Sequence, residues 1–335
     1  MSERLRYRAG TRARAGIITV AVAACLFAPG ATRSSRLRAQ TRTEAGTFQA
    51  TSGLGRKLYA LPDDDAVAAA RKKLAADPKN ASLALALSQA EAGRRQYREA
   101  IATCTKALGF APNNADLYIE RGHREVGLRE FQRAERDLAH AAALDPKKLD
   151  AFYHLGLAHY FQGQFAAAAA AFRKALALAK TDDSVIDCTN WLYVSLRRAG
   201  QSATAAQALT RITPGMKNTE PHLLFYLRLL RFYQGAASEA SVLPPKPASP
   251  DDTEAELSFD TVTYGVGNWH LYNHDPKRAE QLFREVVAGN AWNAWGFVGA
   301  ETDLMRLRAA SAAHQVSSSR PFDRRVASGS SVTRY

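Results

Sequence analysis

Cysteine is scarce in this sequence, and the motifs from which metal and catalytic sites are built are lacking. Its three cysteines, Cys25, Cys104 and Cys188, lack the spacing of metal ligands, and the last two are expected to be buried thiols rather than a disulfide. His270 and His274 stand four residues apart on an expected helix, but no glutamate lies between them as in zinc proteases, and no third ligand is evident. No nucleophile–base pair has sequence support. We therefore expect a protein without a metal, a cofactor or catalytic activity.

Net positive charge is nearly absent from the part of the chain that is expected to fold, because its basic and acidic residues almost balance. Of the net charge of +13, residues 1–43 carry +8 and residues 309–335 carry +3, which leaves +2 for residues 44–308. A protein that binds nucleic acid needs a basic face on its fold to neutralise phosphates. The charge pattern therefore argues against nucleic acid as a partner.

Strand signals are also absent, because the sequence shows no sustained alternation of apolar and polar residues and no Asn-Gly hairpin turn. Hydrophobic residues make up 46% of the chain, which is enough for a sizeable core. Alanine-rich runs at 66–70 and 166–171 favour helix. Residues 56–312 are predicted to consist almost wholly of helices and short turns.

The first 31 residues have the order of a secretory signal. Five arginines fall within residues 1–14, residues 15–28 form an apolar stretch, and small residues with a proline follow. The apolar stretch of about 14 residues is shorter than the roughly 20 that span a bilayer. We expect an exported protein of the bacterial periplasm or cell envelope, with residues 1–31 as its signal peptide or membrane anchor.

Two other fates of the leader stay open. Residues 22–25 resemble a bacterial lipobox, which would place a lipid on Cys25, although the apolar run continues past this cysteine. Three arginines within residues 33–38 follow the apolar stretch and disfavour translocation. They would fit an uncleaved anchor that attaches the protein to the membrane through residues 15–28.

A period of 34 residues organises the middle of the chain. The positions that repeat at this spacing include Ala66, Ala100, Ala134 and Ala168; Pro78, Pro112 and Pro146; and the aromatic residues Tyr97, Phe131 and Phe165. The period defines windows at 81–114, 115–148 and 149–182, and a three-residue insertion then displaces a fourth window to 186–213. A fixed period of this length indicates an array of helical repeats that bury their apolar faces by stacking.

The third window carries the most complete motif, in which an aromatic residue is followed by Leu-Gly and then by Ala-x3-Phe. Its members are Phe152, Leu155, Gly156, Ala168 and Phe172. On these residues the chain resembles the tetratricopeptide repeat family. The resemblance implies an all-α fold, a right-handed superhelical solenoid of antiparallel helix pairs, and a non-catalytic scaffold for protein–protein interaction. Within a unit, the small residues Gly156 and Ala168 let the two helices approach closely.

Period and composition divide the chain into six regions. They are a leader at 1–31, a flexible segment at 32–55, the repeat array at 56–238, a proline-rich link at 239–257, a C-terminal repeat-like unit with a capping helix at 258–312, and a disordered tail at 313–335. In the C-terminal unit, Gly267 and Ala279 keep the spacing of Gly156 and Ala168. The block around Gly267 resembles the last repeat of exported bacterial tetratricopeptide proteins of uncertain role.

The resemblance also implies where a protein or peptide partner would bind, because the first helix of each unit lines a concave surface. The family's groove positions fall on Leu85, Gln89, Ile119, His123, Tyr153, Leu157, Tyr160, Phe161, Tyr264 and Asn268. Family members that clamp a terminal carboxylate use Lys and Asn at such positions, and the matching residues here differ. We expect an apolar and aromatic groove, centred on the positions from Tyr153 to Phe161, that binds an extended or helical peptide.

Three alternatives to this groove stay open. The aromatic side chains can instead pack against the following helix pair, since fully exposed aromatic residues are uncommon. The groove can hold a second copy of the chain and form a homodimer. Finally, Trp269, Trp292 and Trp295 can stack on a sugar, which would make the chain an accessory enzyme or a carbohydrate-binding protein that uses its C-terminal region.

Overall fold

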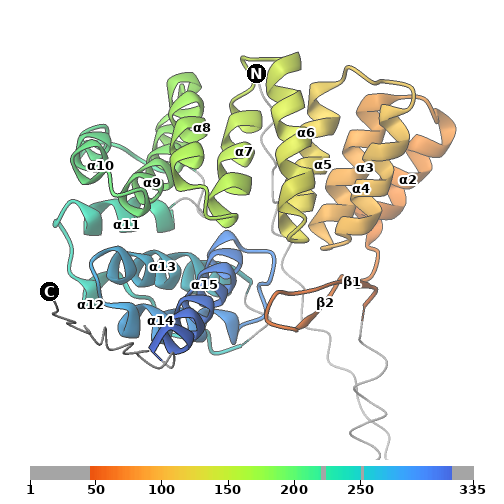
Figure 1. The fold of residues 1–335 in the computed structure, drawn as a ribbon. Helices are drawn as coiled ribbons and strands as arrows, with labels where there is room; N and C mark the ends of the chain where they lie inside the picture. The colour runs from red at the N-terminus through yellow and green to blue at the C-terminus, as the bar shows by residue number, and fades with distance from the viewer. Residues whose placement is uncertain (1–45, 220–223, 250–252, 319–335) are drawn as a thin grey trace, which may run out of the picture. The chain divides into compact units, whose positions relative to one another are not determined.

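The structure is a computed structural model that describes residues 46–219, 224–249 and 253–318. They belong to one compact unit that begins at Gly46. The predicted leader, the predicted lipid on Cys25 and the tail beyond residue 318 lie outside the described residues. The described part consists of helices and one pair of short strands (Figure 1). The prediction of an all-α helical repeat solenoid is confirmed.

The first three predicted windows each contain two helices, and the first helix of the fourth pair begins four residues before the predicted window at 186–213. Together these pairs form the array across the upper part of Figure 1. The pairs are α3 (Ala81–Gly93) with α4 (Tyr97–Leu108), α5 (Ala115–Gly127) with α6 (Phe131–Leu144), α7 (Leu149–Phe161) with α8 (Phe165–Leu178), and α9 (Asp182–Arg198) with α10 (Ser202–Leu209). One helix, α2 (Asp65–Ala76), precedes them. Each helix from α2 to α10 packs on the next, as in a stacked repeat.

Local signals set where these helices begin and how they turn. The side chains of Asn80 and Asn114 accept hydrogen bonds from amides in the first turns of α3 and α5, so they satisfy N–H groups that have no partner within the helix. The turn inside each of the first three pairs contains a residue with positive φ, which is 58° at Arg95, 67° at Arg129 and 81° at Gly163. These residues are 34 positions apart, so the repeat fixes the turn as well as the helices.

Small residues allow the two helices of a pair to approach, as the sequence predicts. A Cβ atom on Gly156 of α7 would lie 2.7 Å from the ring of Phe172 on α8. A Cβ atom on Gly267 would likewise lie 2.7 Å from the ring of Phe283. Both pairs are 16 residues apart in sequence, so the C-terminal unit repeats the helix contact of the array.

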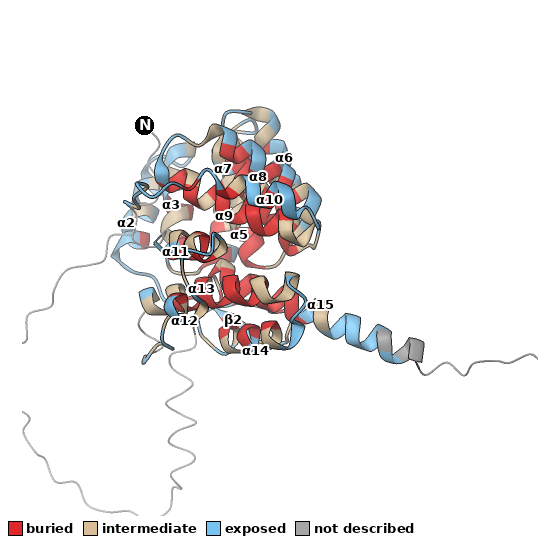
Figure 2. Cartoon of the chain, turned by 90° about the vertical axis from the view of Figure 1, so that its left-hand side faces the viewer, coloured by how far each residue is buried: buried red, intermediate tan, exposed pale blue. Residues whose placement is uncertain are grey.

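The described residues after α10 form five helices. They are α11 (Leu224–Tyr233), α12 (Glu239–Val242), α13 (Thr253–Tyr272), α14 (Pro276–Val287) and α15 (Trp295–Ser318). Both α12 and the first turn of α13 fall inside the predicted proline-rich link at 239–257. The sequence predicts that the capping helix ends at 312, but α15 continues to Ser318. Residues 313–318 are therefore helical and not part of a disordered tail. The exposed end of α15 extends beyond the packed helices (Figure 2).

A β-hairpin corrects the prediction of a flexible segment at 32–55. Strand β1 (Phe48–Thr51) pairs antiparallel with β2 (Lys57–Tyr59). Two strands this short show little alternation, and a lone hairpin is marginally stable. Tertiary contacts stabilise it, because Leu58 is fully buried, the Gln49 side chain accepts a hydrogen bond from the Arg98 amide (2.8 Å), and the indole of Trp292 donates to the Tyr59 carbonyl (3.2 Å).

One large apolar cluster joins the array, the hairpin and the C-terminal helices, and a smaller one lies among α3, α4 and α5. Figure 2 shows the buried residues running from the array into α13 and α14. Cys104 and Cys188 are buried thiols, and the described residues contain no disulfide. No helix in the described part of the chain has both the length and the apolar character needed to span a membrane.

Candidate functional site

The face formed by the first helix of each pair is the candidate binding site, and the structure divides its predicted positions into two sets. Leu85 and Gln89 on α3, with Ile119 and His123 on α5, are half-buried. The other six positions are buried, namely Tyr153, Leu157, Tyr160, Phe161, Tyr264 and Asn268. The face is therefore accessible at the first two repeats and covered at the third repeat and at the C-terminal unit.

The chain's own C-terminal helices make this cover. Helix α15 packs against α7, and α13 packs against α9, so both contact the first helices of their pairs (Figure 1). Their contacts concentrate at the C-terminal ends of these first helices, where Tyr160 and Arg198 lie. A partner that approaches the same surface would have to displace α13 and α15.

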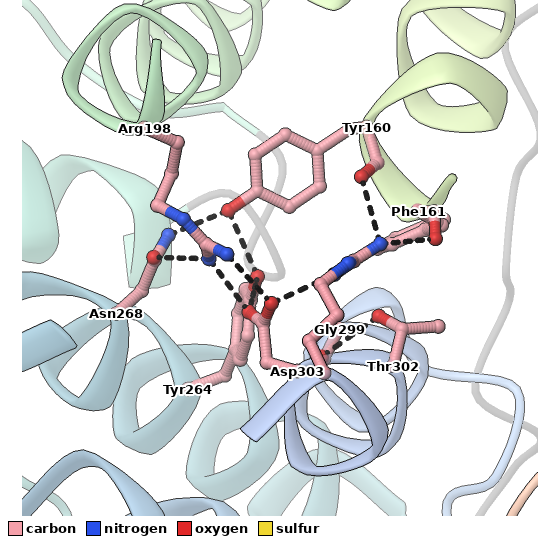
Figure 3. A network of polar contacts seen from close by, with 9 residues as sticks. Tyr160, Phe161, Arg198, Tyr264, Asn268, Gly299, Thr302 and Asp303 are labelled. Atoms are coloured by element: carbon pink, nitrogen blue, oxygen red, sulfur yellow. Dashed lines mark hydrogen bonds and ion pairs between the residues drawn. The ribbon is translucent and has the colours of Figure 1, made fainter. Parts of the chain in front are cut away.

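A buried polar network connects the array to its cover (Figure 3). Asn268 of α13 donates to the Tyr160 hydroxyl (2.6 Å), and Arg198 of α9 donates to the Asn268 side-chain oxygen (3.0 Å). The Tyr264 hydroxyl lies 2.9 Å from that of Tyr160 and donates to Asp303 of α15 (3.1 Å). Four helices that are distant in sequence thus share one set of hydrogen bonds.

An ion pair lies at the centre of this network. Both terminal nitrogens of Arg198 donate to Asp303 at 2.9 Å, in the two-pronged geometry that suits a guanidinium and a carboxylate. Arg306 adds a third hydrogen bond to Asp303, at 2.7 Å. Burial by itself would raise the pKa of Asp303, but Arg198 and Arg306 outweigh it and hold that pKa below its usual value. Asp303 is therefore a buried, charged residue whose partner lies on the array.

Aromatic stacking forms a second contact between the array and the cover. The rings of His123 on α5 and His154 on α7 stack with centroids 4.1 Å apart. Trp295, the first residue of α15, lies 5.1 Å from the His123 ring and 6.1 Å from that of Phe161. His123, a predicted groove position, is thus already in contact with the C-terminal helix.

The turns inside the repeats form a third contact. Arg129 donates to Glu301 of α15 at 2.8 Å, and Glu301 is 1% exposed. Arg95, at the equivalent position one repeat earlier, donates to the carbonyl of Asn290 at 3.2 Å. A left-handed backbone is unfavourable for arginine, and these two side chains use the turn to reach the C-terminal region.

These contacts correct the prediction of an open aromatic groove from Tyr153 to Phe161. The four predicted side chains in this stretch are core residues, and Tyr160 and Leu157 are fully buried. Their apolar area is covered by α9, α13 and α15 instead of a peptide, because the C-terminal unit folds back onto the array. In this part of the face, the aromatic side chains pack against other helices of the chain, as one of the alternatives predicted.

Sequence reasoning missed Asp303 and Glu301, which form the ion pairs between α15 and the array. One signal was present, because Glu301-Thr-Asp303 interrupts an otherwise apolar stretch between Phe297 and Leu304. Charged residues in a buried helix are rare unless they are paired. The positions of their partners, 105 and 172 residues earlier in the chain, could not be read from that stretch.

Two side chains that the sequence offered for metal or sugar binding, His270 and Trp292, make contacts within the chain. The described residues contain no group of three His, Cys, Asp or Glu side chains that could hold a metal ion. His270 is hydrogen-bonded to Glu239 at 2.8 Å, within a set of ion pairs between α12, α13 and α14. Trp292 is 4% exposed. Its indole N–H donates to the Tyr59 carbonyl, and its ring packs against that of Tyr97. Its ring therefore offers no open face to a sugar.

Acid is expected to reduce the stability of the folded protein through the stacked histidines His123 and His154. Burial, with Arg124 nearby, lowers the pKa of His154 to about 3 and that of His123 well below its usual value. Both are neutral in the folded protein and titrate near 6.5 when unfolded. Their contribution to stability is therefore complete above about pH 6.5 and is lost as the pH falls toward 3, by at most about 1.4 kcal/mol per pH unit for each histidine.

The test is urea unfolding of wild type and His154→Gln between pH 7.5 and 4. The difference in unfolding free energy between the two proteins should fall with pH below about 6.5. Comparison of the two proteins is needed because the pKa values of Glu125 and Asp260, both raised to about 8 by burial, act on stability in the opposite direction. His140→Gln, at an exposed position on α6, is the control. An equal pH dependence for all three proteins would contradict the prediction.

Comparison with known proteins agrees with the helix pairs. A model of the tetratricopeptide repeat family matches residues 119–183, which run from α5 to the start of α9. Residues 119–183 therefore carry tetratricopeptide repeats. No curated protein matches the chain. As a class, such repeats are scaffolds for protein interaction.

Several solved structures resemble the chain in part. One is a tetratricopeptide repeat protein from Parabacteroides merdae ATCC 43184, with 18% identity, a TM-score of 0.44, and coverage of 70% of this chain and 89% of that one. YrrB, described as a TPR protein with an unusual peptide-binding site, has 14% identity, a TM-score of 0.41, and coverage of 74% and 100%. MamA has 24% identity, a TM-score of 0.39, and coverage of 43% and 83%.

Proposed function

We propose that this protein is a non-catalytic scaffold of the cell envelope that binds a segment of a partner protein on the accessible part of its first-helix face. The observation that carries the proposal is the contrast along this face. Leu85, Gln89 and Ile119 on α3 and α5 are half-buried, whereas the equivalent positions on α7 are covered by α13 and α15. The N-terminal repeats are thus the part of the face that a partner can reach without displacing the chain's own helices.

The side chains of this accessible part suit an apolar segment. Leu85 and Ile119 are aliphatic, and Gln89 can pair with a peptide amide or carbonyl. The Asp116–Lys148 ion pair (2.6 Å) lies beside them at the start of α5. A helix or an extended segment that presents aliphatic side chains with polar neighbours would fit this surface.

The covered half supports a scaffolding role in a different way. Its buried ion pair and aromatic contacts hold α7, α9, α13 and α15 together, so the repeats are fixed before any partner arrives. A surface that is already ordered loses less conformational entropy when it binds. The leader at 1–31 is the basis for proposing that the partner is an envelope protein.

Site-specific photo-crosslinking tests the proposal. A photoreactive amino acid at Ile119, in cells that express the full chain, should crosslink to a partner in the envelope fraction. The same amino acid at Gln132, which is exposed on α6 and therefore on the second helix of its pair, is the matched control. Leu85→Gln should reduce the Ile119 crosslink, because Leu85 lies on the same face.

The pattern of products decides between the possibilities. A product specific to Ile119 that contains another protein supports the scaffold, and one that contains two copies of this chain identifies a homodimer at the same face. Equal products from Ile119 and Gln132, or none from Ile119, would exclude the first-helix face as the binding site.

A further inference from the structure

A second concave feature lies away from the first-helix face. It is a cavity of ≈ 180 Å³ between α13, the C-terminal end of α14 and the segment after α12. Its polar lining includes Glu256, Asp260 and Glu285, with Lys246 and Asn290. This volume is below the roughly 300–1,000 Å³ of pockets for drug-sized molecules, so the cavity suits a small ligand or a single side chain.

Asp260 is an unusual group in this lining. The residue is 1% exposed, yet its Oδ2 atom has no hydrogen-bond partner. Glu256, one helical turn earlier and 7% exposed, accepts a hydrogen bond from the Asn290 amide at 2.9 Å. Two buried carboxyl groups therefore share one face of α13, and only Glu256 has a partner. A buried carboxylate without a partner is costly, so Asp260 must either hold a proton or pair with a cation.

Arg56, a cation whose charge acts on Asp260, does not pair with it. Arg56, from the loop of the β-hairpin, donates to the carbonyls of Val287 and Gly289 and to the side chain of Asn290. Those bonds satisfy groups at the end of α14, where a positive charge is favourable. Lys246 is exposed, and Gln281 donates to Glu285 at 3.4 Å. When Asp260 is ionised, the carboxylates around the cavity outnumber the cations Lys246 and Arg56.

We propose that this cavity binds an organic cation, a guanidinium or primary ammonium group, with Asp260 as its counter-ion and Glu256 and Glu285 nearby. The size of the cavity and the unpaired oxygen favour an organic cation over a bare metal ion, because the described residues offer no metal-binding group of three. The same cation could be a free amine or guanidine, or the Arg or Lys side chain of a partner protein. The site is distinct from the face on α3 and α5 and does not depend on it.

The pH dependence of binding follows from the state of Asp260. Burial and the neighbouring Glu256 raise its pKa to about 8, and Arg56 opposes this only in part. The groups that face it are Glu256 on its own helix, Glu285 on α14, Lys246 after α12 and Arg56 from the hairpin. Below about pH 8 a cation must displace a proton, so affinity should fall by as much as roughly tenfold per pH unit and should level off above pH 8.

Calorimetric titration of the full chain with agmatine at pH 6 and pH 9 tests the proposal, with butylurea as a neutral ligand of similar size. Agmatine should bind more tightly at pH 9, by as much as about 100-fold. Asp260→Asn should weaken binding at pH 9 at least about tenfold, because it removes a charge-assisted hydrogen bond. Glu254→Gln, at an exposed position on the same helix, is the matched control and should bind as wild type does.

A five-residue peptide with a central arginine distinguishes the source of the cation. If the peptide binds and its citrulline counterpart does not, the site accepts a partner's side chain; if only agmatine binds, it accepts a free cation. Absence of agmatine binding at pH 9, equal binding by butylurea, or an unchanged affinity in Asp260→Asn with a native circular dichroism spectrum would each overturn the proposal. The pH profile of the wild type keeps the test valid even if the variant does not fold.

Discussion

Asp303→Ala is expected to destabilise the protein by about 3–5 kcal/mol, because it leaves the guanidinium of Arg198 buried without a counter-charge. The Asp303 side chain is fully buried and that of Arg198 is 10% exposed, so water cannot replace the lost carboxylate. The same change removes the acceptor of Tyr264 and one partner of Arg306. Urea unfolding, followed by circular dichroism, measures the loss.

Two further variants separate the charge from the fold. Glu280→Ala breaks an exposed ion pair with Arg284 on α14 and should cost less than about 1 kcal/mol. Replacement of both members of the buried pair, as Arg198→Met with Asp303→Leu, should cost less than Asp303→Ala alone, because Arg198 is then not left buried without a counter-charge. Arg306 also loses Asp303, but its side chain is 29% exposed and it keeps its hydrogen bond to the Phe161 carbonyl. A loss below about 1 kcal/mol for Asp303→Ala would mean that the pair does not hold α15 on the array.

Tyr160→Ala is expected to lower the free energy of unfolding by about 3–5 kcal/mol, because it removes a fully buried ring from the core. The ring lies 5.2 Å from those of both Phe165 and Trp191, and its hydroxyl accepts from Asn268. Tyr160→Phe keeps the ring and leaves the Asn268 amide without this acceptor, so we expect about 1–3 kcal/mol. Thermal and urea unfolding of the three proteins give the comparison.

This experiment also discriminates between a core residue and a groove residue. Tyr59 is 41% exposed on the hairpin, and Tyr59→Ala should cost less than about 1 kcal/mol, as is usual for surface substitutions. If Tyr160→Ala behaves like Tyr59→Ala, then Tyr160 is accessible in solution and α13 and α15 do not cover it. If it destabilises as expected, its effect on partner binding reports on folding, and Ile119 is the position that reports on the surface.

Part of the candidate site could be predicted from the sequence. The groove positions on α3 and α5, such as Leu85 and Ile119, lie on first helices as the repeat motif requires, and binding at them remains a prediction. The positions from Tyr153 to Phe161 also lie on a first helix, but their apolar character is compatible with two different roles. An aromatic side chain that can bind a peptide can equally bind another helix of the same chain, and the motif does not distinguish the two.

The sequence by itself determined the helix pairs, because the information for them is local. The 34-residue period, the caps at Asn80 and Asn114, and the recurring turn residues all act over a few positions and repeat along the chain. Tertiary structure alone decided which part of the face is covered, where the hairpin lies and why Asp260 lines a cavity. Arg198 contacts Asp303 across 105 residues, and Leu54 contacts Glu301 across 247. Such pairs form only after the chain has folded back on itself, and no local pattern specifies which distant residue will be the partner.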